Sequence, residues 1–267
     1  MHTLAVLSLK GGVGKTTVAL GLASAAQARG LRALVADLDP QCNATSALDP
    51  AASSATLADV LAAPRRSVLD AAIAPSGWGS GLDVLVGSER AGELNDPDPG
   101  SRRLNRLGKA IAELNRLIDH GELPYQLVIL DCPPSLGRLT RSALVAAQGA
   151  LMVTEPNLFA VSGVQRAAEA VDTERSDHNP TLRPAGVVVN RVRPRSKEHA
   201  FRIEELRLNF GTQVLEPTLP DRTAIQQAQG ACAPIHRLRT PGAREVSRAF
   251  DALLDNVVNH ANTPAVR

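Results

Sequence analysis

The segment Lys10-Gly11-Gly12-Val13-Gly14-Lys15-Thr16-Thr17 holds three glycines between two lysines. It follows an apolar run over 3–9 and opens a helical pattern over 16–29. A strand, a glycine-rich turn and a helix in that order form a phosphate cradle, because backbone N–H groups and the positive end of the helix dipole converge on the anion. We expect Lys15 to reach the β- and γ-phosphates of a nucleotide and the Thr16 hydroxyl to bind Mg²⁺.

Short apolar runs alternate with helical patterns along the rest of the chain. The expected strands are 3–9, 33–37, 82–86, 127–131, 150–154 and 185–190. The expected helices are 16–29, 56–63, 102–119, 138–147, 159–172, 197–209 and 243–258. Continuous apolar strands that alternate with helices predict an α/β fold, a doubly wound, mostly parallel sheet with helices on both faces. Ligands of such folds bind at the carboxyl ends of the strands.

Composition and length favour one ordered domain. The chain has 267 residues, of which 44% are hydrophobic and only 2% aromatic, so Ala, Val and Leu must fill the core. We expect a single domain over 1–258, a flexible tail over 259–267, and surface loops at the irregular stretches 74–81 and 95–101. Three widely separated cysteines and a strand close to the start of the chain favour the cytoplasm over secretion. No apolar run is long enough for a membrane span.

Carboxylates stand at the ends of two expected strands. The segment Asp37-Leu38-Asp39-Pro40-Gln41 ends one strand, and Asp131 ends the apolar run Leu127-Val128-Ile129-Leu130. An Asp-Pro turn commonly does no more than end a strand, and many strands end in aspartate. A site that hydrolyses a nucleotide, however, needs one carboxylate to orient water and another to hold the metal. Beside the glycine-rich loop, Asp131 has the Walker B pattern of a metal-holding aspartate.

The glycine-rich loop departs from the strict phosphate-loop pattern at two positions. Leu9 occupies the place of the first glycine, and a second lysine, Lys10, stands directly before the paired glycines. This is the deviant Walker A motif, and the chain resembles the ParA/MinD family of P-loop ATPases, most closely its ParA (Soj-like) chromosome and plasmid partition members. The resemblance is strongest over 3–48 and 126–156. It implies ATP and Mg²⁺ as cofactors and a slow, partner-stimulated hydrolysis of ATP.

The resemblance also implies roles for single residues. In the family's switch I the second aspartate positions water, which implies this role for Asp39 and leaves Asp37 to support the metal or the loop. Together with the two lysines of the glycine-rich loop, the expected catalytic residues are Lys10, Lys15 and Asp39. In relatives the extra lysine reaches the partner's phosphates, so Lys10 implies an ATP-dependent homodimer. The segment 132–137 resembles switch II. The implied nucleotide contacts are Gly11, Gly12, Val13, Gly14, Lys15, Thr16, Thr17 and Asn190, and the implied metal ligands are Thr16 and Asp131.

Two segments of the last third of the chain resemble the parts of the family site that surround the adenine base. An asparagine at the position of Asn190 reads the adenine base in relatives, although a strand-end asparagine can also simply cap a turn. The segment Thr218-Leu219-Pro220-Asp221-Arg222 resembles the loop beside the adenine, but Asp221 stands where relatives commonly carry a basic residue. We therefore expect no particular base contact from this second segment.

Positive charge gathers in the last third of the chain. Residues 183–248 hold 12 Lys and Arg against 6 Asp and Glu, whereas the rest holds 17 against 21. Few aromatic residues accompany this charge, which favours non-specific contact with double-stranded DNA over single-strand stacking. The candidate DNA contacts are Arg191, Arg193, Arg195, Lys197, Arg202 and Arg222. The alternative is a set of solvated helix faces paired with neighbouring glutamates. The family resemblance further implies a ParB-like activator and association with the nucleoid.

Three other functions are compatible with parts of this sequence. A MinD-like or other cargo-positioning ATPase would act through a protein or membrane surface, but Asp251 and Asp255 interrupt the polar side of the last helix, which favours core packing over a membrane surface. An electron carrier like the nitrogenase iron protein would need paired cysteines, and we interpret Cys132 as a small buried side chain. A nucleotide-bound regulator without turnover is disfavoured by the presence of Lys15 and Asp39.

Overall fold

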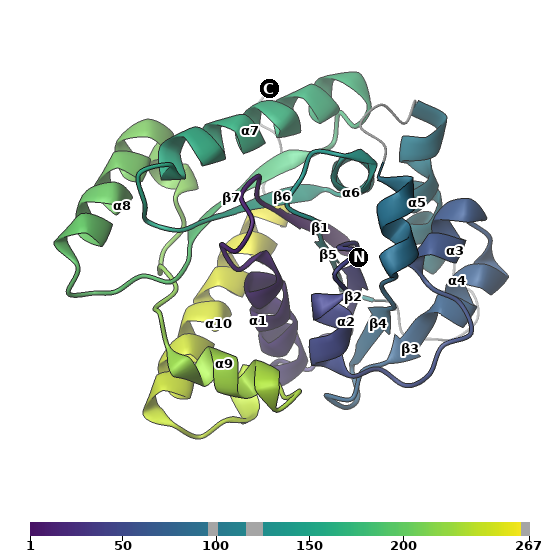
Figure 1. Ribbon diagram of the computed structural model, residues 1–267, viewed down its shortest axis with the longest axis horizontal. Helices are drawn as coiled ribbons and strands as arrows, with labels where there is room; N and C mark the ends of the chain where they lie inside the picture. The colour runs from purple at the N-terminus through teal and green to yellow at the C-terminus, as the bar shows by residue number, and fades with distance from the viewer. Residues whose placement is uncertain (96–100, 116–124, 263–267) are drawn as a thin grey trace.

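The computed structural model describes residues 1–95, 101–115 and 125–262. Within these residues a seven-stranded sheet has the order β3-β4-β2-β5-β1-β6-β7, with helices on both faces (Figure 1). The strands are β1 (His2–Leu7), β2 (Ala33–Asp37), β3 (Ile73–Pro75), β4 (Leu82–Leu85), β5 (Leu127–Asp131), β6 (Gly149–Thr154) and β7 (Arg183–Val189). The α-helices are α1 (Lys15–Ala28), α2 (Asn43–Leu48), α3 (Leu57–Ala62), α4 (Arg66–Ala72), α5 (Ser101–Asn115), α6 (Arg138–Ala146), α7 (Ala160–Asp177), α8 (Lys197–Phe210), α9 (Thr223–Gly230) and α10 (Pro241–Asn262).

The strand order places the candidate site at the middle of the sheet. β1 pairs in parallel with β5 on one side and with β6 on the other, and β2 pairs in parallel with β5. The register sets Asp131 of β5 opposite both Asp37 of β2 and Val6 of β1. β2 and β4 lie on one side of β1 and β6 and β7 on the other, and β5 returns to lie between β2 and β1. The carboxyl ends of β1, β2 and β5 are therefore neighbours at the centre of the sheet, where ligands of such folds bind.

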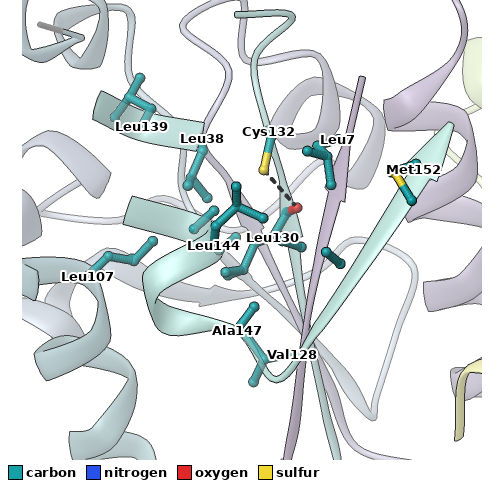
Figure 2. Packing of buried hydrophobic residues seen from close by; sticks show 14 of the residues in the cluster. Leu7, Leu38, Leu107, Val128, Leu130, Cys132, Leu139, Leu144, Ala147 and Met152 are labelled. Atoms are coloured by element: carbon teal, nitrogen blue, oxygen red, sulfur yellow. Dashed lines mark hydrogen bonds between the residues drawn. The ribbon is translucent and has the colours of Figure 1, made fainter. Parts of the chain in front are cut away.

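Alternate residues of each strand enter two different apolar layers, because successive side chains of a strand point to opposite faces. Leu4 and Val6 of β1 pack in the layer that contains α1 and α10, whereas Ala5 and Leu7 pack in the layer that contains α5, α6 and α7. Figure 2 shows part of the second layer at close range, with Leu107 of α5, Leu130 of β5 and Leu144 of α6 among its buried side chains. Both faces of the central strands are therefore buried, which explains their continuous apolar sequences.

The structure confirms the predicted α/β fold and most of the predicted elements. β2 and β5 have the predicted bounds, whereas the strand expected over 3–9 ends at Leu7 and the strand expected over 185–190 begins at Arg183. The helix expected over 159–172 continues to Asp177. The end of the helix expected over 102–119 lies outside the described residues. Such shifts arise because the hydrophobic pattern is weakest where an element leaves the core.

Several short elements were not predicted. α2, α4 and α9 have six to eight residues, which is too short for a helical period to show in the sequence. The prediction of a loop over 74–81 is wrong for its first two residues, because β3 extends to Pro75 and pairs antiparallel with β4. β3 lies at the edge of the sheet, where proline is tolerated. In the second predicted loop, 95–101, residues 96–100 lie outside the described residues. A flexible tail was expected over 259–267, but α10 extends to Asn262. Residues 263–267 lie outside the described residues, so the limits of the domain expected over 1–258 stay a prediction.

Candidate nucleotide site

The glycine-rich loop joins the end of β1 to the first turn of α1 (Figure 1). Gly12 and Gly14 have φ angles of 81° and 87°, a region that L side chains rarely adopt, and α1 begins directly afterwards at Lys15. The two lysines of the loop lie in different environments. Lys15 is only 6% exposed, whereas Lys10 is exposed, and no hydrogen bond or ion pair of its ammonium group is found within the described residues. The loop thus presents one lysine inward and the other outward.

Thr16 and Asp131 form the polar centre of the site. The Thr16 hydroxyl donates to Asp131 Oδ2 at 2.7 Å and joins the start of α1 to the end of β5. Asp131 Oδ1 is buried and has no hydrogen-bond partner in the part of the chain that is described. Burial, and then repulsion from Asp37, raise the pKa of Asp131 to about 8. An unpaired buried carboxylate oxygen beside a hydroxyl calls for a cation, and these oxygen donors fit Mg²⁺.

Asp37 and Asp39 lie two residues apart at the end of β2 and have different surroundings. Asp37 is fully buried, and its carboxylate accepts hydrogen bonds from the Thr45 N–H at 2.7 Å and the Asp39 N–H at 3.2 Å. Burial raises the pKa of Asp37 to about 6. Asp39 is 9% exposed, and its Oδ1 accepts from the Gln41 N–H at 3.0 Å. Of the two roles left open for Asp37, the geometry favours support of the loop.

Asn190 contacts the glycine-rich loop from the end of β7. Its Nδ2 donates to the Val13 carbonyl at 2.8 Å, and a Cβ placed on Gly14 would lie 2.2 Å from the same nitrogen. Asn190 is 1% exposed, and its Oδ1 is a buried atom without a hydrogen-bond partner among the described residues. The amide therefore holds the loop with one end and leaves an acceptor at the other. The adenine contact implied for Asn190 stays a prediction.

The segment predicted as switch II leads from the buried end of β5 to a surface turn. Pro134, Ser135 and Leu136 are exposed, whereas Cys132 is fully buried and packs among leucines (Figure 2). Its Sγ lies 3.6 Å from the Leu130 carbonyl oxygen, to which the thiol donates, and burial raises the pKa of this thiol. The interpretation of Cys132 as a small core side chain is confirmed. A thiol enclosed in the core offers no ligand to a cluster shared between subunits.

Most of the predicted DNA contacts have carboxylate partners. Arg193 pairs with Asp221 at 3.1 Å, and Arg222 holds Glu245 with two nitrogens at 2.9 Å. The other two pairs are Arg191 with Glu155, and Arg202 with Glu198 and Glu205. For Arg195 and Lys197, in contrast, no ion pair is found within the described ranges. Among the described residues, four of the predicted contacts are therefore paired with carboxylates, whereas Arg195, just before α8, and Lys197, at its first position, have no such pair.

Four residues of the site were not predicted. Thr45 fixes Asp37 through its N–H, and its hydroxyl accepts from the Gly87 N–H at 2.9 Å. Asn95 accepts from the Leu139 N–H at 3.1 Å and so caps the helix after switch II. Gln229 of α9 donates to the Thr17 hydroxyl at 3.1 Å. Glu155 pairs with Arg191. None of the four belongs to a local motif, because each meets its partner only through the fold.

This sheet and this site define a class of protein, the P-loop nucleotide-binding proteins of the deviant Walker A type. The chain matches the family model described as "AAA domain" over residues 1–183. It is 31% identical over 238 residues to "Chromosome partitioning protein ParA" of Caulobacter vibrioides, which covers 88% of this chain and 86% of the relative. It is also 31% identical to "Chromosome-partitioning ATPase Soj" of Thermus thermophilus, with 96% of this chain and 97% of the relative covered. The chain therefore belongs to the ParA family of P-loop ATPases.

A solved structure shares this fold over the whole chain. "Cobyrinic Acid a,c-diamide synthase from Mycobacterium smegmatis with bound ATP analog and Magnesium" is 26% identical, with a TM-score of 0.78 and complete coverage of both chains. The match extends beyond the sequence family model, which ends at residue 183, and so includes α8, α9 and α10.

Proposed function

We propose that this protein is a Mg²⁺-dependent ATPase that forms an ATP-dependent homodimer and positions DNA or another cargo. The observation that carries the proposal is the opposite orientation of the two lysines in one loop. Lys15 is buried beside the Thr16–Asp131 pair, whereas Lys10 is exposed at the loop surface. Partition proteins ParA and Soj are the relatives at 31% identity, and a solved structure at 26% identity contains an ATP analogue and magnesium.

The loop residues supply the binding of ATP. Backbone N–H groups of Gly11–Thr17 and the Lys15 ammonium group neutralise the phosphates, while the Thr16 hydroxyl and Asp131 are the protein ligands of Mg²⁺. When bound, Mg²⁺ stabilises negative charge on the β- and γ-phosphate oxygens. Asp39 orients the attacking water, because it keeps 9% exposure whereas Asp37 is fully buried and holds the N–H groups of its own segment. Asp37 holds the Asp39 and Thr45 N–H groups and so positions this segment.

Lys10 supplies the second half of the mechanism in the dimer. Its exposed ammonium group reaches the phosphates of a partner subunit and adds positive charge where the transferred phosphoryl group builds negative charge. Nucleotide is then part of the interface, so ATP favours the dimer by mass action and its hydrolysis releases the dimer. Arg195 and Lys197, which lack carboxylate partners among the described residues, are the first candidates for non-specific contact with the DNA backbone.

Cargo positioning completes the proposal. A ParB-like activator would stimulate hydrolysis, and DNA binding would place the protein on the nucleoid in the cytoplasm. None of the helices in the described ranges combines the length and apolar character that crossing a bilayer requires. If DNA binding is absent in both nucleotide states, a cargo-positioning role through a protein surface replaces the DNA-bound one.

Light scattering with and without a non-hydrolysable MgATP analogue tests the dimer. We expect the wild type to dimerise only with the analogue, Lys15→Ala to lose nucleotide binding, and Lys10→Ala to bind nucleotide but stay monomeric. Lys109→Ala, which removes an exposed lysine from α5, is the matched control and should behave as the wild type. A Lys10→Ala protein that dimerises and hydrolyses ATP normally would disprove the role of Lys10.

A further inference from the structure

Arg191 contacts the glycine-rich loop, although its position in the sequence places it in the predicted basic surface. Its Nη1 donates to the Gly12 carbonyl at 2.7 Å and to Glu155 Oε1 at 2.7 Å. These two contacts join the tip of the loop to the ends of β6 and β7. The preceding residue, Asn190, donates to the Val13 carbonyl at 2.8 Å. Two successive residues after β7 therefore hold two successive carbonyl groups of the loop.

The direction of these carbonyl groups determines the shape of the phosphate cradle. In a trans peptide the C=O of one residue and the N–H of the next point in opposite directions. When Arg191 holds the Gly12 carbonyl on the outer side, the Val13 N–H points away from Arg191. The Asn190 contact fixes the Gly14 N–H through the Val13 carbonyl in the same way. Backbone N–H groups that are fixed before the anion arrives bind it without a cost of reorganisation.

The backbone at Arg191 supports a specific role. Its φ is 55°, in the left-handed region that L side chains other than Asn and Asp rarely adopt. Such conformations persist where the surroundings determine them, and they cluster at functional sites. Glu155 also neutralises the guanidinium group, so Arg191 offers less free charge to a polyanion than its sequence context suggests. The pair borders an open pocket of about 260 Å³ with Asn157 and His199.

We propose that Arg191 is a positioning residue of the nucleotide site, with Glu155 as its counter-charge, and not a DNA contact. This inference rests on the proposed ATPase function. Arg191 does not touch the reacting atoms; it acts through the Gly12–Val13 peptide. Its loss should therefore weaken ATP and ADP equally, raise KM for ATP and leave kcat almost unchanged.

Calorimetric titration of the full chain with MgADP and with a non-hydrolysable MgATP analogue tests the proposal. A hydrogen bond from a charged donor, half exposed here, predicts a loss of about 5- to 10-fold in affinity for Arg191→Ala. The matched control is Arg193→Ala, which removes the same charge two residues away, from a side chain that is 72% exposed and paired with Asp221. We expect the control to bind both nucleotides within about 2-fold of the wild type, since it loses only a surface ion pair.

Two further variants separate positioning from folding. Arg191→Gly removes the side chain but suits the positive φ, so it should keep the wild-type stability to urea and still lose nucleotide affinity. Arg191→Lys retains a donor for the Gly12 carbonyl and should recover part of the affinity. At saturating analogue, binding of Arg191→Ala to duplex DNA should equal that of the wild type.

The results distinguish the inference from the function on which it rests. Nucleotide affinity that is equal in Arg191→Gly and Arg193→Ala, with a wild type that binds ATP, would overturn the positioning role alone. A fall in DNA affinity at unchanged nucleotide affinity would return Arg191 to the DNA surface. A wild type that binds no nucleotide would refute the ATPase proposal and this inference together.

Discussion

Replacing Gly14 with alanine tests the geometry of the cradle most directly. Gly14 has a φ of 87°, so a side chain there strains the backbone by about 1 kcal/mol. The new Cβ would also lie 2.2 Å from Asn190 Nδ2, a distance that no real contact allows. The Asn190 amide must then move and lose its buried hydrogen bond to the Val13 carbonyl, which costs about 1–3 kcal/mol. We expect Gly14→Ala to lower the free energy of unfolding by roughly 2–4 kcal/mol.

A matched control separates the two terms. Gly30 has a φ of 72°, but a Cβ there would meet no atom within 4 Å. Gly30→Ala should therefore show only the backbone strain of about 1 kcal/mol. In an Asn190→Ala background the obstacle is gone, and adding Gly14→Ala should cost about the same as Gly30→Ala.

Urea unfolding of the nucleotide-free protein measures all four variants. The chain has a single tryptophan, Trp78, which is 2% exposed, so its fluorescence follows unfolding without interference from another indole. Gly14→Ala and Gly30→Ala of equal stability, or an unchanged cost of Gly14→Ala after removal of Asn190, would refute the contact between Asn190 and the loop. Loss of MgATP binding in Gly14→Ala but not in Gly30→Ala would follow from the same displacement.

Three further outcomes follow from the structure. The pKa values of about 8 for Asp131 and about 6 for Asp37 lie above the usual 3.8, so the folded apoprotein holds protons that the unfolded chain loses. Its free energy of unfolding should therefore fall as the pH rises from 4 to 8. Urea titrations should show a smaller fall for Asp131→Asn, and an identical slope would contradict the raised pKa of Asp131. Gly21→Ala should destabilise the protein by about 1–3 kcal/mol, because a Cβ on α1 would lie 2.1 Å from Phe250 Cζ of α10, and Phe250→Leu should recover part of this loss in thermal unfolding. Replacing Arg195 and Lys197 by alanine should lower the salt dependence of duplex binding by about one ion each. Arg202→Ala should change it less, because the Arg202 side chain is already paired with Glu198 and Glu205. The opposite ranking in filter binding across salt concentrations would exclude Arg195 and Lys197 as contacts.

The class of fold and the centre of the site could be predicted from local patterns of residues. The continuous apolar runs of β2 and β5 set both strands at their predicted bounds, since a strand buried on both faces must be apolar throughout. The spacing from Lys10 to Thr17 is local, so a phosphate loop between β1 and α1 follows from neighbouring residues alone. Asp131 could be found because it ends an apolar strand. The parallel register sets it beside Val6 of β1, and the loop that follows β1 then brings Thr16 to its carboxylate.

The distant side chains that complete that loop could not be predicted, because they meet it only in the folded protein. Asn190 and Arg191 reach Val13 and Gly12 across 177 and 179 residues of chain, and no local pattern encodes such a meeting. The same holds for the pairing of the predicted DNA contacts with carboxylates, since Arg222 meets Glu245 only where α10 packs beside α9. Local sequence fixes hydrogen-bonding and hydrophobic preferences over a few residues, whereas the partners of a polar group are chosen by the packing of the whole sheet and its two layers of helices.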